Sequence, residues 1–372
     1  MRKIVLFLRE LDPWMIVGVA ALLLLGFTAI WSAGIATGAS EVGKQAVALG
    51  IGLVFFFAVA AAHPRTIFRF RYLLYLLGMI LLVVVLIFGH SAKGTQGWLR
   101  FGGLTFQPVE LAKIFLLIVL AAILPLHART KSWQAMIGAT VASALYVFLV
   151  MLEPDLGSSL LLICLWAVTL LVSGIPRRYV AGIFVTAAVV AVLAWQFGLH
   201  DYQKARVLTF LDPSRDPQGR GYNVAQAQIA VGSGGLFGKG FASGSQSQLR
   251  FLPESQTDFI FALIVEELGF FAGVAVVAAM GLVVFRLFRL ARRAPDDFSQ
   301  FLAIGAATLL TAETLVAVGG NIGLLPMTGI TLPFVSSGGS SLIAHFILLG
   351  LVASAYRASV RGSALRPAEL AT

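Results

Sequence analysis

Charged residues are scarce in this chain: Asp, Glu, Lys and Arg make up 12% of its 372 residues. A soluble domain carries about 25% charge, so the composition excludes an ordinary soluble protein. Cysteine is nearly absent as well. The single Cys164 lies in an apolar run and can form no internal disulfide, so we interpret it as a packing residue. The first apolar run is too long for a cleavable signal peptide and lacks a small-residue cleavage site.

Long apolar stretches dominate what remains. Hydrophobic residues account for 59% of the chain, and the mean hydropathy is +0.91. A hydrocarbon core of about 30 Å requires a helix of about 20 residues. The sequence therefore predicts an all-α polytopic membrane protein with one transmembrane domain over residues 1–372 and about ten spans. The predicted spans are 14–32, 45–62, 72–88, 111–126, 135–152, 156–173, 180–199, 259–285, 301–318 and 341–356.

The positive charges indicate the orientation of these spans, because Lys and Arg are enriched in cytoplasmic loops. One set of alternate loops holds Arg2, Lys3, Arg9, Arg65, Arg69, Arg71, Arg129, Lys131, Arg177, Arg178, Arg286, Arg289, Arg292, Arg293, Arg357, Arg361 and Arg366. The opposite short loops hold only Lys44, Lys93, Arg100 and Lys113. Both termini are therefore expected in the cytoplasm, with the chemistry on the outer face. The same distribution accounts for the net charge of +10 without a nucleic acid partner.

Two outer segments are too long or too irregular to be simple connections. Residues 200–258, between the seventh and eighth spans, are polar, Gly-rich and mixed in charge. Loops longer than about 12–15 residues are uncommon unless they bind something or are disordered. Residues 319–341, before the tenth span, are apolar but interrupted by Pro326, Pro333 and glycines. Irregular backbone is not tolerated against lipid, so this re-entrant-like segment should be covered by protein or line a cavity.

The second outer loop ends in a helix start, with Gln107 near the cap and Pro108 in the first turn. Glu110 then either complements the helix dipole or orients Lys113 three residues on. Lys113 itself is either a snorkelling interface cation or a cation for an anionic lipid headgroup. The spacing alone favours the structural alternative for both residues.

A glycine-rich run at 232–240 invites comparison with a phosphate-binding loop. The comparison fails, because Ser233 stands where the first Gly is required and Gly240 replaces the Ser or Thr after Lys239. Backbone N–H groups in such a run can still hold a phosphate, but a flexible turn is the favoured interpretation.

Several carboxylates around the eighth and ninth spans have more than one interpretation. Ser255 and Asp258 match a capping box. However, a continuous helix from 259 to 286 would be about 40 Å long, which places Asp258 at the outer interface as a candidate base. The buried positions expected for Glu266, Glu267 and Glu313 mark each as a functional or partner site. Hydroxyl and N–H groups at 336–341 could bind an anion or simply cap the tenth span.

Four long motifs together resemble the SEDS family (shape, elongation, division and sporulation) of ten-span peptidoglycan glycosyltransferases. They are GWLRFGGLTFQPVELAK, FLDPSRDPQGRGYNVAQAQIAVGSGGLFGKG, QSQLRFLPESQTDFIFALIVEELGF and NIGLLPMTGITLPFVSSGGSS, in this order over nearly the whole chain. The GKG…GSQSQLRFLPE version is more similar to the elongation branch, RodA, than to the division branch, FtsW. Two departures are visible, since Gln256 stands where many relatives carry His and Ser337 where they carry Tyr.

The resemblance implies polymerisation of lipid II at the outer face of the bacterial cytoplasmic membrane. It places the family's essential Asp at Asp258, its first outer Trp at Trp98, and its Glu and Lys at Glu110 and Lys113. A carboxylate base of this kind suits attack by a sugar hydroxyl. If Asp258 proves to be only a cap, Glu110 and Glu254 are the next candidates.

The leaving polyprenyl pyrophosphate needs cations or N–H donors, with or without a divalent cation such as Mg²⁺. The candidate groups for substrate binding are Lys113, Arg206, Arg220, Lys239, Glu254, Ser336, Gly338 and Gly339. Two other functions stay open at this point. One is a flippase for a lipid-linked precursor, with Glu266 and Glu313 as its relay, and the other is a scaffold for a class B penicillin-binding protein.

Overall fold

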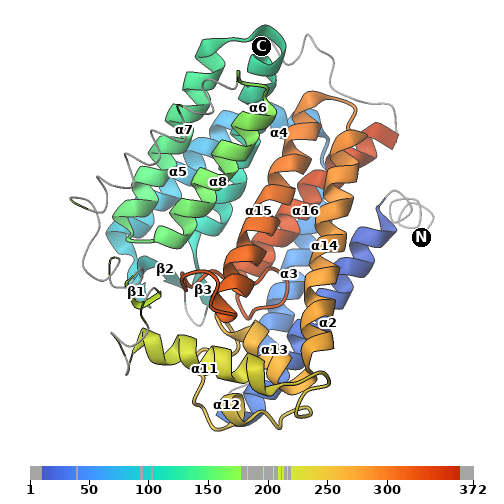
Figure 1. Cartoon of the computed structure of the whole chain (residues 1–372). Coiled ribbons are helices and arrows are strands. Elements are labelled where there is room, and N and C mark those ends of the chain that lie inside the picture. Colours follow the sequence, from blue (N-terminus) through green and yellow to red (C-terminus); the bar gives the residue numbers. More distant parts are fainter. Residues whose placement is uncertain are drawn as a thin grey trace.

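The computed structural model describes residues 11–360, except 39–40, 93–94, 102–103 and most of 177–218. Within these residues, eight helices are long and apolar enough to cross a membrane, and α8 is a shorter apolar helix. They form one bundle (Figure 1). The helices are α2 (Pro13–Thr37), α3 (Glu41–Ala61), α4 (Pro64–Arg69), α5 (Arg71–Phe88), α6 (Pro108–Thr130), α7 (Trp133–Leu152), α8 (Leu156–Val172), α11 (Arg220–Ser233), α12 (Ser245–Gln248), α13 (Ile260–Leu268), α14 (Phe270–Arg292), α15 (Asp297–Asn321) and α16 (Gly339–Val360).

The all-α membrane fold predicted from composition is confirmed, and eight of the ten predicted spans coincide with one helix each in the described part of the chain. The predicted seventh span, 180–199, and the basic residues at 177–178 lie outside the described residues. The helices α6, α15 and α16 are the most enclosed, and most of their side chains are buried. The helices α2, α5 and α7 instead leave many large apolar side chains exposed, as expected for helices that face lipid.

The predicted eighth span is not one helix. It divides into α13 and α14 at Gly269, whose φ of 85° and ψ of 177° are accessible almost only to glycine. A neighbouring loop packs into this break, where Phe270 N–H donates to Gly235 O and Gly240 N–H donates to Glu267 O, both at 2.9 Å. Asp258 therefore does not lie at the end of a continuous helix of about 40 Å, as was predicted, although it still precedes α13.

A small antiparallel sheet lies at the end of the bundle that also carries α11 and α12 (Figure 1). Its strands are β1 (His90–Ala92), β2 (Thr95–Phe101) and β3 (Leu104–Phe106), in the order β1-β2-β3. Trp98 pairs with His90, and Leu99 pairs with Phe106. The sequence did not predict these strands, because two of them are three residues long and show no alternating pattern. We call this end of the molecule the loop face.

Candidate active site

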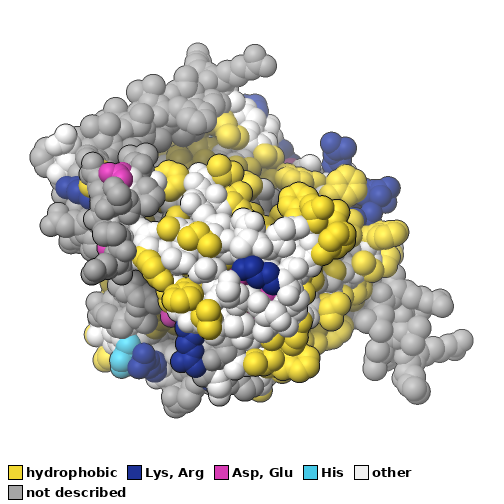
Figure 2. Space-filling view, turned by 60° about the horizontal axis from the view of Figure 1, so that its bottom comes forward, with side chains coloured by type: hydrophobic (Ala, Val, Ile, Leu, Met, Phe, Trp, Pro, Cys, Tyr) yellow, Lys and Arg dark blue, Asp and Glu magenta, His cyan; other side chains and the backbone are white. Residues whose placement is uncertain are grey.

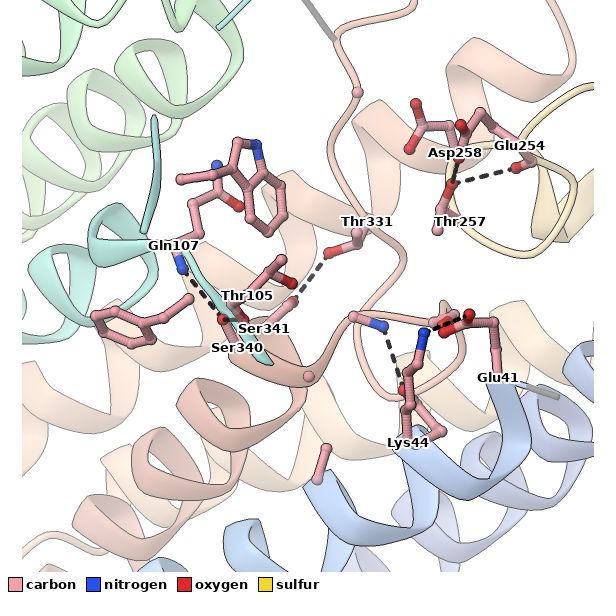
Figure 3. Close-up of a pocket in the computed structure, with 18 of the residues that line it drawn as sticks. Glu41, Lys44, Thr105, Gln107, Glu254, Thr257, Asp258, Thr331, Ser340 and Ser341 are labelled. Atoms are coloured by element: carbon pink, nitrogen blue, oxygen red, sulfur yellow. Dashed lines mark hydrogen bonds and ion pairs between the residues drawn. The ribbon is translucent and has the colours of Figure 1, made fainter. Parts of the chain in front are cut away.

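A cavity of about 760 Å³ opens at the loop face. Its walls come from the sheet, from the N-terminal end of α3, from the turn before α13, and from the segment that leads into α16 (Figure 3). Figure 2 looks onto this face, where the described surface is largely apolar and uncharged, with isolated Lys and Arg side chains. The charged residues that line the cavity are Glu41, Lys44, Asp155, Glu254 and Asp258.

Asp258 lines this cavity at the end of a tight turn. Glu254 begins the turn with a φ of 53°, a left-handed conformation that is costly for a residue with a side chain. Thr257 reaches back across the turn, and its hydroxyl donates to Glu254 Oε2 at 2.9 Å (Figure 3). Strained turns of this kind recur at functional sites, where the surrounding structure holds them in place.

The capping box predicted for Ser255 and Asp258 is not formed. The cap residue of α13 is Phe259, which makes no side-chain cap hydrogen bond. The Ser-x-x-Asp spacing is present, but the turn at Glu254 shifts the start of the helix to Ile260. The capping explanation for Asp258 is therefore wrong, and the residue lines the cavity.

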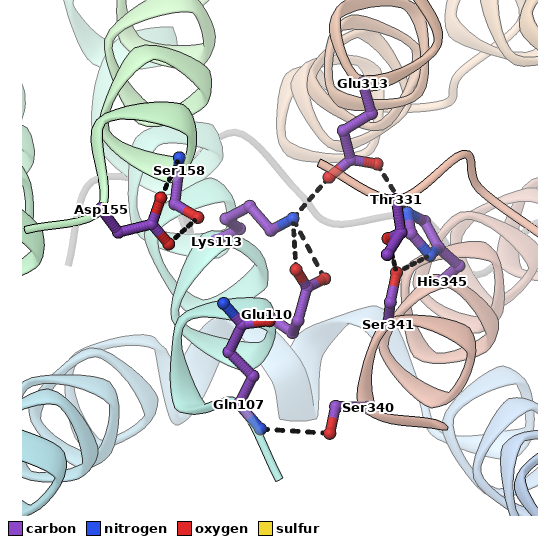
Figure 4. Close-up of polar contacts among 10 residues, drawn as sticks. All are labelled: Gln107, Glu110, Lys113, Asp155, Ser158, Glu313, Thr331, Ser340, Ser341 and His345. Carbon is purple, nitrogen blue, oxygen red and sulfur yellow. Dashed lines mark hydrogen bonds and ion pairs between the residues drawn. The ribbon is translucent and has the colours of Figure 1, made fainter. Parts of the chain in front are cut away.

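Lys113 is buried in the bundle and does not line the cavity. Its ammonium group lies 3.0 Å from a carboxylate oxygen of Glu110 and 2.5 Å from one of Glu313 (Figure 4). The interpretation of Lys113 as a snorkelling interface cation is wrong, because its side chain is only 5% exposed. The prediction that Glu110 orients Lys113 agrees with this geometry, whereas direct contact between Lys113 and a headgroup stays a prediction.

A chain of hydrogen bonds connects this ion cluster to the cavity wall. Glu313 Oε2 lies 2.6 Å from His345 Nε2, and Ser341 Oγ lies 3.3 Å from His345 Nδ1. Ser341 Oγ in turn lies 2.9 Å from Thr331 Oγ1 (Figure 4). Ser341 and Thr331 both line the cavity. The buried charges therefore fix the positions of two hydroxyl groups that a substrate can reach.

Lys239, Glu266 and Glu267 do not reach the cavity, and they hold the glycine-rich loop instead. Lys239 Nζ donates to Glu266 Oε1 at 3.0 Å and to Ser245 Oγ at 2.8 Å. Glu267 accepts hydrogen bonds from Ser32 Oγ at 2.5 Å and from Gln248 Nε2 at 2.9 Å. The predicted flexible turn is wrong, because this loop is tied to the break between α13 and α14.

Close backbone approach explains the glycines of this loop. A Cβ added to Gly234 would lie 2.0 Å from Val265 O, and one added to Gly238 would lie 2.1 Å from Glu267 O. The backbone N–H groups of Lys239 and Gly240 donate hydrogen bonds to the carbonyls of Glu266 and Glu267. These groups are therefore not presented to a phosphate.

Five of the eleven candidate site residues meet in the cavity. Those that line it are Trp98, Glu254, Asp258, Gly338 and Gly339. Ser336 is buried behind the wall, where its hydroxyl donates to Thr257 O at 2.7 Å. Arg206 and the side chain of Arg220 lie outside the described residues, so their predicted roles stay predictions.

Sequence reasoning missed Lys44 as a site residue. Its side chain is 66% exposed and lies 2.8 Å from Glu41, one turn earlier on α3. It is the only cation among the described residues that line the cavity. Its position at one end of an apolar span was a signal, because a Lys at the end of a membrane helix lies near the level of the lipid headgroups. The adjacent Gln45 also belongs to the site, since its amide bonds to Ser336 O and Gly338 N.

The comparisons with known proteins agree with this architecture. The family model described as cell cycle protein (FtsW, RodA and SpoVE) matches residues 13–360. Peptidoglycan glycosyltransferase MrdB from Escherichia coli K12 is 38% identical over 93% of this chain and 93% of its own length. Probable peptidoglycan glycosyltransferase FtsW from Thiomicrospira cyclica is 35% identical over 93% of this chain and 91% of its own.

Two solved structures share the fold. One, described as "Structural coordination of polymerization and crosslinking by a peptidoglycan synthase complex", has a TM-score of 0.80 and 34% identity, covering 94% of this chain and 98% of the other. The rod shape-determining protein RodA from Thermus thermophilus has a TM-score of 0.69 and 31% identity, with 93% and 97% covered. The chain belongs to the FtsW, RodA and SpoVE family of cell cycle proteins, which is the SEDS family that its motifs resemble.

Proposed function

We propose that this protein is a peptidoglycan polymerase that joins lipid II molecules into glycan strands for cell elongation and shape. The observation that carries the proposal is Asp258, a carboxylate that lines a cavity lying beside exposed apolar surface of α3. Val47 and Ile51 of α3 line the cavity and are 56% and 36% exposed. A lipid-linked sugar could therefore place its headgroup beside Asp258 while its tail follows this apolar helix into the bilayer.

The reaction needs one base. The hydroxyl oxygen of the acceptor sugar attacks the anomeric carbon of the donor, which forms the new glycosidic C–O bond. The bond between that carbon and the pyrophosphate oxygen breaks, and the polyprenyl pyrophosphate leaves with the electron pair. Asp258 takes the hydroxyl proton, a role typically worth about 10²–10⁴-fold in rate. The pyrophosphate leaves as an anion, so a second acid is not required.

The charges of the cavity favour one end of it for the pyrophosphate. Glu254 and Asp258 would repel a phosphate, whereas Lys44 lies at the α3 side beside Gly338 and Gly339 at the start of α16. A cation and the N-terminus of a long helix both stabilise an anion. These charges support a pyrophosphate of the donor bound at Lys44, with the acceptor hydroxyl toward Asp258.

A divalent cation such as Mg²⁺ stays part of the proposal. No group of three or more His, Cys, Asp or Glu side chains in the described part of the chain could hold a metal alone. Mg²⁺ is commonly held by one or two carboxylates together with substrate phosphates, and Glu41 lines the cavity at the Lys44 end, where the pyrophosphate is proposed to bind. When bound there, the ion would neutralise charge on the leaving pyrophosphate.

The proposed setting is the bacterial cytoplasmic membrane, with both termini inside and the cavity on the outer face. The distribution of Lys and Arg supports this orientation. A cysteine placed at Met327 should be labelled from outside in a Cys164→Ala background, whereas one at Arg292 should not. Labelling at Arg292 from outside would refute the orientation. A class B penicillin-binding protein is the proposed partner, because a solved relative is described as part of a peptidoglycan synthase complex.

The flippase alternative loses its proposed relay in this structure. Glu266 bonds to the glycine-rich loop, whereas Glu313 bonds to Lys113 and His345. The two carboxylates therefore belong to separate networks. A pure scaffold would need neither a cavity nor a carboxylate held within it by a strained turn.

The decisive experiment measures glycan polymer formed from lipid II by purified variants. Asp258→Asn keeps the shape of the side chain but cannot accept a proton, so turnover should fall by about 10²–10⁴-fold. Asp297→Asn is the matched control, because this carboxylate forms an exposed ion pair with Arg129 far from the cavity. If folded Asp258→Asn keeps more than about a tenth of the native rate, Asp258 is not the base. Glu254 would then be tested first, since Glu110 is paired with Lys113.

A further inference from the structure

Three consecutive backbone carbonyls in the turn before α13 are held by the last residue of α15 and by the segment that joins α15 to α16. Ser337 N–H donates to Gln256 O at 2.8 Å. Ser336 Oγ donates to Thr257 O at 2.7 Å, and Asn321 Nδ2 donates to Asp258 O at 2.9 Å. The peptide groups around the proposed base are therefore fixed from outside their own segment. Asn321 is the member of this set that bonds to Asp258 itself.

Both N–H groups and the oxygen of the Asn321 side-chain amide form hydrogen bonds. Its Nδ2 group also donates to Ala317 O at 2.8 Å, and its Oδ1 accepts from Ala262 N–H at 3.0 Å. Only one orientation of the amide, with nitrogen toward the two carbonyls and oxygen toward the N–H, satisfies all three partners. The side chain is 1% exposed, so the end of α15 holds it in a single position.

These contacts replace the missing cap of α13. The first N–H groups of a helix lack partners within the helix, and Asn321 Oδ1 accepts one of them, from Ala262. A cap is normally supplied by the residue just before the helix, but that residue is Phe259, whose side chain cannot accept a hydrogen bond. Because a residue 63 positions away bonds to this turn, Asp258 keeps its carboxylate at the cavity.

We propose that Asn321 is a positioning residue for Asp258: its amide fixes the Asp258 peptide and the first turn of α13, and so sets the carboxylate at its place in the cavity. The proposal rests on the proposed function, in which Asp258 is the base. The carboxylate lies next to Gly329, since a Cβ added to this glycine would be 3.8 Å from Asp258 Oδ2. A catalytic group must keep its geometry closely, because a displacement of about 1 Å can reduce the rate about 100-fold.

The test compares Asn321→Ala and Asn321→Asp with the wild type, using glycan polymer formed from lipid II. The Ala variant removes all three contacts. The Asp variant has the same shape and can accept from Ala262 N–H, but an ionised carboxylate cannot donate to Asp258 O. In both folded variants kcat should fall about tenfold or more, with KM changed less than about threefold, since the loss is in the reacting geometry. Thr308→Val is the control on the same helix: it removes a buried hydroxyl bonded to Ile304 O and should keep the native rate.

A double-mutant cycle separates positioning from general loss of structure. If Asn321 acts through Asp258, Asn321→Ala should cause no further fall in the residual rate of Asp258→Asn. Native kcat in folded Asn321→Ala and Asn321→Asp would overturn the proposal, as would a full additional loss in the Asp258→Asn background. If Asn321→Ala does not fold, Asn321→Asp decides alone. A native rate in Asp258→Asn would instead refute the proposed function, so the two failures are distinguishable.

Discussion

Glu153 is a buried acid in the turn between α7 and α8. Its side chain is 0% exposed, and neither carboxylate oxygen has a hydrogen-bond partner among the described residues. Burial, with a smaller contribution from nearby Asp155, raises its pKa from 4.5 to about 9. The folded protein therefore holds this carboxyl protonated at neutral pH, although the unfolded chain would ionise it.

The consequence is a pH-dependent free energy of unfolding. Below pH 4.5 both states keep the proton, so the contribution to stability is complete. As the pH rises from 4.5 toward about 9, only the unfolded state releases the proton, and stability is lost progressively. Each pH unit in this window corresponds to about 1.4 kcal/mol. Between pH 6 and pH 8 the wild type should lose as much as about 2.7 kcal/mol from this group.

Glu153→Gln should remove this loss, because an amide of similar shape cannot ionise. The variant should be more stable than the wild type, and the difference should grow by about 2–3 kcal/mol from pH 6 to pH 8. Unfolding of the purified proteins in detergent at both pH values measures the difference. Asp297→Asn is the control, since an exposed ion pair contributes only about 0–1 kcal/mol. A gap between wild type and Glu153→Gln that is equal at the two pH values would refute the reasoning.

Two further predictions concern the cations. Lys113→Ala leaves Glu110 and Glu313 buried without their partner, so the free energy of unfolding should fall by about 3–5 kcal/mol. Unchanged stability with lost polymerisation would instead indicate that Lys113 contacts the substrate directly. Lys44→Ala should raise KM for lipid II with little change in kcat, and Glu41→Gln should lower KM because it releases Lys44. Equal KM values in all three proteins would remove Lys44 from the pyrophosphate site.

The membrane helices could be predicted from sequence because the length and composition of each segment are enough to identify it as a spanning helix. A stretch of about 20 apolar residues has few alternatives to a spanning helix. The charge of the connecting loops supplied the expected orientation in the same local way. The error came at Gly269, where one glycine inside an apolar run looks tolerable in a helix. Its positive φ depends on the loop at 234–240, which is remote in sequence.

The roles of the charged residues depend on partners that the sequence does not bring together. Lys113 lies 200 positions before Glu313, and no local pattern indicates that they meet. Sequence reasoning therefore placed Lys113 at the interface and treated Glu313 as a separate site. Lys239 was assigned to substrate for the same reason, since its partner Glu266 belongs to another motif. Asp258 was located by the motif, but only the structure shows that it lines a cavity.

The segments that the sequence presents as separate motifs are hydrogen-bonded to one another beside the cavity. The glycine-rich loop packs into the break at Gly269, which makes α13 a short helix of nine residues. A short helix that has one of its first N–H groups, that of Ala262, bonded by α15 can begin with a turn that has no cap of its own. That turn is where Asp258 lies, with the segment before α16 bonded to its backbone. The position of the proposed base therefore depends on three connections distant in sequence, which is why mutations at Asn321 should act on the rate through Asp258.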